Sequence, residues 1–139
     1  LPSVDEPAIV SKPVPRGTET ILVVDDDREA RLLMQEWLQE QGYRVLEVGD
    51  GETALLLAVQ QPEPIHLLVT DVMMPEMNGK ELARRLAALR AGLKVLYVSG
   101  CSEEVLASYG VTRPGDEWLP KPFTIEGLAA KVRKILDRT

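Results

Sequence analysis

Short runs rich in apolar residues recur along the chain, each bounded by polar or turn-forming residues. Such runs are typical of parallel strands that are buried on both faces of a sheet. The predicted strands are residues 21–24, 43–48, 66–70, 94–99 and 117–120. The segments between them show helical spacing or begin with a capping residue. The predicted helices are residues 28–41, 53–60, 80–90, 103–108 and a final helix that Thr124 caps.

Five strands that alternate with five helices predict one architecture. The order β then α, repeated along the chain, favours a doubly wound α/β fold, in which helices cover both faces of a parallel sheet. Right-handed crossovers are expected between the strands. In such sheets, ligands bind beyond the carboxyl ends of the strands.

The first predicted helix carries two apolar pairs at helical spacing. Leu33 lies one turn from Trp37, and Met34 lies one turn from Leu38. We expect Trp37 to pack in the core, because a large aromatic side chain buries considerable area; a surface that faces a partner is the alternative. Asp27 is expected to cap this helix, since aspartate accepts from free helix N–H groups.

The first 19 residues differ in character from the rest. They hold prolines at positions 2, 7, 13 and 15 and show no sustained apolar period. This pattern is typical of an extended linker. We therefore expect a Pro-rich linker over residues 1–19 and a single folded domain over residues 20–139, a size that suits one hydrophobic core.

Composition restricts the class of protein. The net charge of -6 argues against direct contact with nucleic acid, which needs clustered basic residues. No apolar run reaches the roughly 20 residues that cross a bilayer. The single cysteine, Cys101, and the lack of a secretory signal pattern favour the cytoplasm, while a membrane anchor elsewhere in a longer parent protein stays open.

Polar residues that suit phosphoryl chemistry follow the predicted strands. They are Asp25, Asp26, Asp71, Ser99 and Lys121. Three carboxylates at one sheet edge repel one another by about 4 kcal/mol per pair at about 4 Å and an effective dielectric near 20. A cation is needed there, and oxygen ligands favour Mg²⁺, or Mn²⁺ as an alternative, over Zn²⁺.

These residue types suggest distinct roles. A carboxylate whose charge a metal ion offsets can act as a nucleophile toward phosphorus and form an acyl phosphate, and Asp71 is the best candidate. The transferred phosphoryl group carries negative charge on its equatorial oxygens. An ammonium and a hydroxyl should flank it, and Lys121 and Ser99 fit those roles.

Four motifs in order, ILVVDDD, LLVTDVMMPEMNG, VLYVSG and WLPKPF, make the chain resemble the response-regulator receiver family of two-component signalling. The resemblance covers roughly residues 20 to 138. It implies a flavodoxin-like sheet of five parallel strands in the order 2-1-3-4-5, with five helices. It also implies that the chain is a phosphoacceptor that receives its phosphoryl group from a phosphohistidine, rather than an enzyme with turnover.

The resemblance carries roles onto matching positions. It implies that Asp71 is phosphorylated, that Asp25 and Asp26 form an acidic pocket, and that the carbonyl of Met73 completes the Mg²⁺ ligands. Further implied roles are phosphoryl contacts from Ser99 and Lys121, a cis bond before Pro122, and a switch that couples Ser99 to Trp118. Tryptophan departs from the tyrosine or phenylalanine that the family usually carries at that position, which puts the usual switch in doubt.

The implied partner is a histidine kinase or a histidine phosphotransfer domain, and a phosphorylation-dependent dimer is a further candidate. The chain starts at Leu1 and has a linker ahead of the domain. This arrangement is similar to that of the C-terminal receiver of a hybrid sensor histidine kinase. The alternatives are a stand-alone response regulator and a receiver-like module that is never phosphorylated. A phosphohydrolase would want a second aspartate at position 73, and a flavin protein would want a hydroxyl-rich loop after the first strand.

Overall fold

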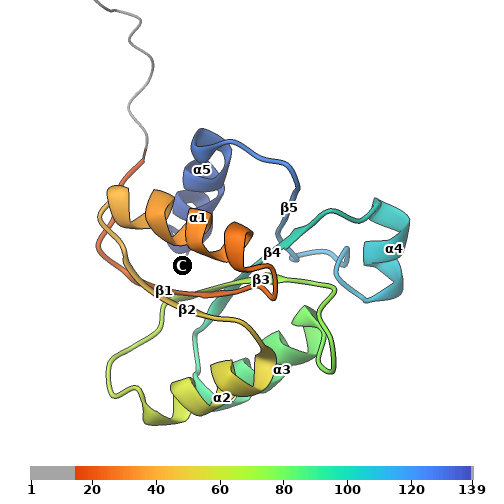
Figure 1. Ribbon diagram of the computed structural model, residues 1–139, viewed down its shortest axis with the longest axis horizontal. Helices are drawn as coiled ribbons and strands as arrows, with labels where there is room; N and C mark the ends of the chain where they lie inside the picture. The colour runs from red at the N-terminus through yellow and green to blue at the C-terminus, as the bar shows by residue number, and fades with distance from the viewer. Residues whose placement is uncertain (1–14, 139) are drawn as a thin grey trace, which may run out of the picture.

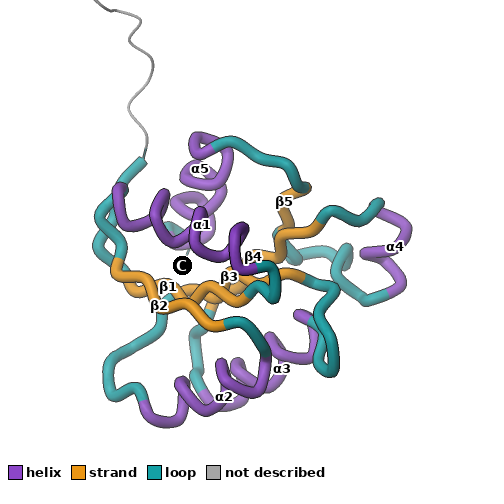
Figure 2. The backbone as a smooth tube through the Cα atoms, in the orientation of Figure 1, coloured by secondary structure: helices purple, strands orange, loops and turns teal. Residues whose placement is uncertain are grey.

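The computed structural model describes residues 15–138, and a single parallel sheet forms their centre (Figure 2). The strands are β1 Thr20–Val24, β2 Arg44–Val48, β3 Leu67–Asp71, β4 Lys94–Ser99 and β5 Trp118–Pro120. The helices are α1 Arg28–Glu40, α2 Gly51–Gln60, α3 Gly79–Leu89, α4 Glu103–Ser108 and α5 Ile125–Leu136. The strand order is β2-β1-β3-β4-β5, which confirms the expected doubly wound fold.

Helices cover both faces of the sheet, and alternate residues of the strands form two apolar layers. Figure 1 shows α1 and α5 on one face and α2 and α3 on the other. On the first face, Ile21 and Val23 of β1 pack with buried residues of α1 and α5. On the second face, Leu22 and Val24 pack with α2, α3 and Leu106 of α4. Within residues 15–138, no helix is long and apolar enough to cross a membrane.

Side-chain caps fix where the helices start. Asp27 caps α1 as expected, because its carboxylate accepts from the Glu29 N–H at 3.0 Å. Two helices begin earlier than their predicted starts. Asp50 caps α2 through the Thr53 N–H (2.7 Å), so that the helix begins at Gly51. Polar residues before each helix satisfy N–H groups that have no partner inside it.

The buried face of α1 is narrower than predicted. Met34 and Leu38 are buried, whereas Leu33, one turn from Trp37, is 44% exposed. Trp37 is partly buried and packs edge-on against Phe123, with ring centroids 6.3 Å apart. The two residues therefore lie at the rim of the core.

The predicted linker, residues 1–19, lies mostly outside the described residues. Its last part contacts the domain: the Gly17 N–H donates to the Gln41 carbonyl at 3.0 Å. Arg133 of α5 donates to the Arg16 carbonyl at 3.2 Å and pairs with the carboxylate of Glu19 at 2.6 Å. Residues 16–19 are thus attached to the edge of the domain opposite the carboxyl ends of the strands.

Candidate functional site

The register of the sheet brings the candidate residues to one edge. Asp71 at the end of β3 pairs with Val98 of β4, so Ser99 lies one residue further along. Ser99 in turn pairs with Pro120 of β5, and Lys121 follows directly. The Lys121 N–H donates to the Ser99 carbonyl at 2.8 Å, which extends the ladder by one step.

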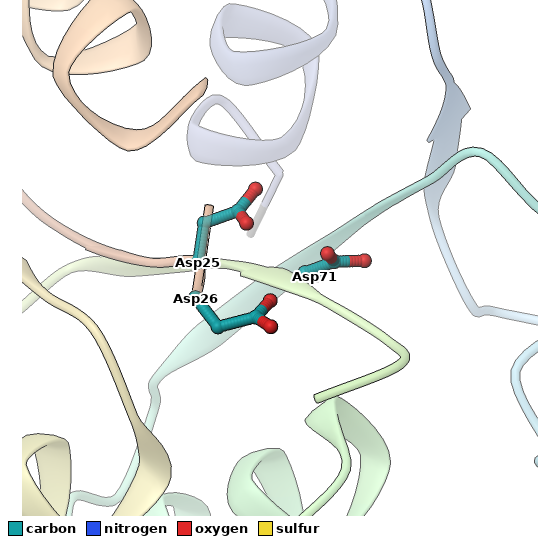
Figure 3. A group of neighbouring side chains, drawn as sticks. All are labelled: Asp25, Asp26 and Asp71. Atoms are coloured by element: carbon teal, nitrogen blue, oxygen red, sulfur yellow. The ribbon is translucent and has the colours of Figure 1, made fainter. Parts of the chain in front are cut away.

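Three carboxylates gather at this edge. Asp25 and Asp26 follow β1, and Asp71 ends β3; Figure 3 shows their side chains beside one another. One oxygen from each lies within 4.8 Å of the other two. Asp25 is fully buried, Asp71 is partly buried and Asp26 is exposed. The site therefore has a buried floor and an open side.

Lys121 supplies the cation that the carboxylates face. Its Nζ lies 2.9 Å from Oδ2 of Asp25 and 3.5 Å from Oδ2 of Asp71. Burial alone would lower the pKa of Lys121, but the hydrogen bond and the charges of the two carboxylates raise it overall. The lysine therefore stays protonated and can donate hydrogen bonds to an anion.

The environment of Asp71 disfavours its charged form. Burial raises the pKa of its carboxyl; Lys121 opposes this effect, while the negative charges of Asp25 and Asp26 add to it. The partial desolvation keeps a carboxylate oxygen less shielded by water, and a bound cation would restore the charged form. This is the environment expected of a carboxylate that reacts with an electrophile.

Oxygen donors, negative charge and an open side make this edge suitable for a magnesium ion. Mg²⁺ prefers carboxylate and carbonyl oxygens and keeps several water ligands, for which the exposed position of Asp26 leaves space. Among residues 15–138, Asp25, Asp26 and Asp71 form the one group of three or more acidic, histidine or cysteine side chains close enough to share an ion.

Ser99 and Met73 border the site without joining the carboxylate cluster. Ser99 is buried, and its Oγ accepts a hydrogen bond from the Cys101 N–H at 3.0 Å. Met73 lies two residues after Asp71 in the loop that leads to α3, and its Sδ contacts Sγ of Cys101 at 2.8 Å. Both residues thus stand at the carboxyl ends of β3 and β4.

The expected switch residue occupies the edge strand. Trp118 begins β5, pairs with Tyr97 and is partly buried against the apolar layer that contains Leu106. The peptide bond between Lys121 and Pro122 is cis. Trp118 and Lys121 therefore lie at opposite ends of one three-residue strand and its following turn.

An apolar groove of about 410 Å³ runs beside Lys121. Its walls are Ala30, Leu33, Met34 and Trp37 of α1, together with Lys121, Pro122 and Phe123 after β5. The sequence alone indicated core packing for this face of α1. Only the approach of the segment after β5, more than 80 residues later, converts the exposed side of the helix into a groove.

One residue near the site has no signal in the sequence. Arg31 of α1 donates from Nη1 to the backbone carbonyl of Asp25 at 2.9 Å and pairs with Glu47 of β2. A basic residue in the first turn of a helix is ordinary on a solvated face. Its partner is 16 residues away, so only the folded structure brings the two together.

A model of the response regulator receiver domain matches residues 21–133. The sensor kinase CckA of Brucella abortus is 34% identical over 125 residues, which are 88% of this chain and 13% of CckA. The response regulator MprA of Mycolicibacterium vanbaalenii is 38% identical over 120 residues, which are 86% of this chain and 51% of MprA. The chain thus spans about half or less of these relatives.

Solved receiver structures agree with the observed fold. The receiver domain of the hybrid histidine kinase CckA has a TM-score of 0.71 and 33% identity over 85% of this chain and 99% of that domain. TrrA of Thermotoga maritima, solved with Mg²⁺ and BeF, has a TM-score of 0.71 and 31% identity over 85% and 99% of the two chains. The chain therefore belongs to the family of response regulator receiver domains, the phosphoacceptor modules of two-component signalling.

Proposed function

We propose that Asp71 is the phosphoacceptor and that it receives its phosphoryl group from a phosphohistidine on a histidine kinase or a histidine phosphotransfer domain. In this proposal Asp25, Asp26, Asp71 and the Met73 carbonyl hold Mg²⁺, or Mn²⁺ as an alternative. The observation that carries the proposal is the Lys121 ammonium between two carboxylates, 2.9 Å from Asp25 and 3.5 Å from Asp71. The chain is then an acceptor in a relay and not an enzyme with turnover.

The transfer follows from the placement of these groups. An oxygen of Asp71 donates an electron pair to phosphorus and forms the new O–P bond. The N–P bond of the phosphohistidine breaks, and the imidazole nitrogen keeps the bonding pair of that bond and takes a proton from solvent. Asp25, Asp26, Asp71 and the Met73 carbonyl would hold Mg²⁺, which would offset negative charge on the phosphoryl oxygens. Lys121 and the Ser99 hydroxyl donate to the remaining oxygens, and water later hydrolyses the acyl phosphate.

The test is phosphoryl transfer from a phosphorylated histidine phosphotransfer protein, followed by intact mass. Asp71→Asn removes the nucleophile but keeps the shape of the side chain. Asp27→Asn is the matched control, because Asp27 is a neighbouring carboxylate that caps α1. We expect an adduct on wild type and on the Asp27 variant and none on the Asp71 variant. An adduct on Asp71→Asn would contradict the assignment.

The apolar groove supports a docking place for the phosphodonor in the same proposal. It adjoins Lys121, and Leu33 contributes an exposed apolar side chain. A donor protein that buries an apolar helix face here would hold its histidine near the strand ends. Leu33→Asp should slow transfer from a donor protein roughly tenfold, which corresponds to a loss of about 1.4 kcal/mol in docking free energy, and should leave phosphorylation by a small acyl phosphate unchanged. Equal slowing with both donors would argue against docking.

A switch at Trp118 is part of the proposal. The Ser99 hydroxyl accepts a hydrogen bond from the Cys101 N–H at 3.0 Å. The phosphoryl group would draw this hydroxyl away from Cys101, and the Trp118 side chain would move into the space that it leaves behind β4. The chain holds two tryptophans, so a Trp37→Phe background leaves Trp118 as the single tryptophan, which can be excited selectively. Its emission should change on phosphorylation, and an unchanged emission would reject the switch.

The parent protein is proposed to be a hybrid sensor histidine kinase in the cytoplasm or anchored to the membrane. Support comes from the 34% identity with the sensor kinase CckA. The 38% identity with the response regulator MprA supports the alternative, a receiver in a stand-alone regulator. The length of the complete gene separates the two. Light scattering before and after phosphorylation tests for a phosphorylation-dependent dimer.

A further inference from the structure

Arg31 makes two contacts that join three elements at the acidic edge. Its Nη1 donates to the backbone carbonyl of Asp25 at 2.9 Å, and its Nε pairs with the carboxylate of Glu47. The Arg31 side chain is 15% exposed and that of Glu47 is 28% exposed, so this is not a fully solvated surface pair. A Cβ at Gly49 would lie 3.1 Å from Nη1, which means that the glycine leaves room for the guanidinium. The arginine is thus held between the ends of β1 and β2.

The carbonyl that Arg31 binds belongs to the peptide that joins Asp25 to Asp26. Asp25 makes two further hydrogen bonds. Its backbone N–H donates to the Val48 carbonyl at 3.3 Å, and its side-chain Oδ1 accepts from the Asp27 N–H at 2.9 Å. With Arg31 on the carbonyl, the peptide plane after Asp25 is fixed. The direction of that plane decides where the exposed carboxylate of Asp26 can point.

We propose that Arg31, oriented by Glu47, is a positioning residue for the divalent cation site. It acts through the Asp25–Asp26 peptide and does not touch the ion. The inference rests on the proposed function, since it concerns the metal site assigned there. Groups that orient metal ligands commonly alter affinity by about 10-fold to 100-fold when they are replaced. Because Glu47 offsets the charge of Arg31, orientation and not net charge carries the effect.

Arg31→Lys tests whether Arg31 acts by orienting the Asp25–Asp26 peptide or by its positive charge. Lysine keeps the positive charge but lacks the planar fork that reaches the Asp25 carbonyl and Glu47 together. Glu47→Gln keeps the arginine and weakens its support. Arg133→Lys is the matched control: Arg133 also pairs with a partly buried carboxylate, Glu19, and also donates to a backbone carbonyl, at the opposite edge of the sheet.

The experiment titrates the full chain with MgCl₂ and follows backbone amide resonances. We expect Arg31→Lys to weaken Mg²⁺ binding about tenfold and Glu47→Gln to weaken it less, while Arg133→Lys binds as wild type does. In metal-free protein, the Asp26 amide should shift in Arg31→Lys but not in Arg133→Lys. Raising the Mg²⁺ concentration should rescue phosphorylation of Arg31→Lys by a small acyl phosphate.

Two outcomes overturn different statements. Wild-type affinity in both Arg31→Lys and Glu47→Gln, with an unshifted Asp26 amide, would reject the positioning role and leave the metal site in place. Absence of Mg²⁺ binding by the wild type would reject the proposed metal site itself. If Arg31→Lys does not fold, the Mg²⁺ titration of Glu47→Gln and the shift of its Asp26 amide decide whether the positioning role holds.

Discussion

Replacing Asp71 with asparagine should stabilise the metal-free protein, although it removes the proposed nucleophile. The reason is that the carboxylate of Asp71 is crowded by two others. Burial raises its pKa, and Asp25 and Asp26 raise it further against the opposing effect of Lys121. A charge held in such a place costs folding free energy, which an uncharged side chain of the same shape avoids.

The magnitude follows from the separations. One oxygen of each carboxylate lies within 4.8 Å of the others, so at an effective dielectric of about 20 each of the two repels Asp71 by at least about 3.5 kcal/mol, about 7 kcal/mol together. Lys121, at 3.5 Å, returns about 5 kcal/mol. We therefore expect Asp71→Asn to raise the free energy of unfolding by about 2 kcal/mol near neutral pH.

Urea unfolding in a chelator checks this value. Because the pKa of Asp71 is raised in the folded state, its favourable contribution is complete below the unfolded pKa and is lost as the pH rises through the folded pKa. The stability gap between the variant and the wild type should therefore close at low pH. Saturating Mg²⁺ should also close or reverse it, since the ion binds wild type better. A variant less stable than wild type in chelator would refute the reasoning.

Three further substitutions test the framework. Lys121→Met should lower the free energy of unfolding, measured by urea denaturation, by about 3 kcal/mol, because it leaves the fully buried carboxylate of Asp25 without its cation. Glu19→Gln should cost about 1 kcal/mol at pH 7. Arg133 holds the pKa of Glu19 at about 2, below 4.5, so that cost is complete above pH 4.5 and vanishes as the pH falls through about 2 in acid unfolding curves. Gly79→Ala should cost about 2 kcal/mol by thermal unfolding, since its Cβ would collide with the carbonyl at the end of β3.

The fold could be predicted from the sequence because each signal was local. The apolar run before Asp25 and the run before Asp71 mark strands, and the residue after each strand identifies the edge where they meet. Helix starts were harder to predict, since α2 begins at Gly51, two residues ahead of the predicted start. A cap depends on the backbone angles of one residue, which the apolar period does not determine.

Contacts between distant segments away from the strand ends could not be predicted. Leu33 has the spacing of a core residue, yet the core is filled by Met34 and Leu38, so Leu33 stays at the surface. The ion pair between Arg31 and Glu47 requires β2 to lie beside α1. Such contacts arise from tertiary packing, which the apolar and polar pattern of one segment does not contain.

The most direct test of the central claim is the intact mass of the chain after incubation with Mg²⁺ and a small acyl-phosphate donor. Asp71→Asn and a chelator control run in parallel. We predict one phosphoryl adduct on the wild type that requires both the metal ion and Asp71. An adduct that survives in Asp71→Asn, or that forms equally in chelator, would contradict the account.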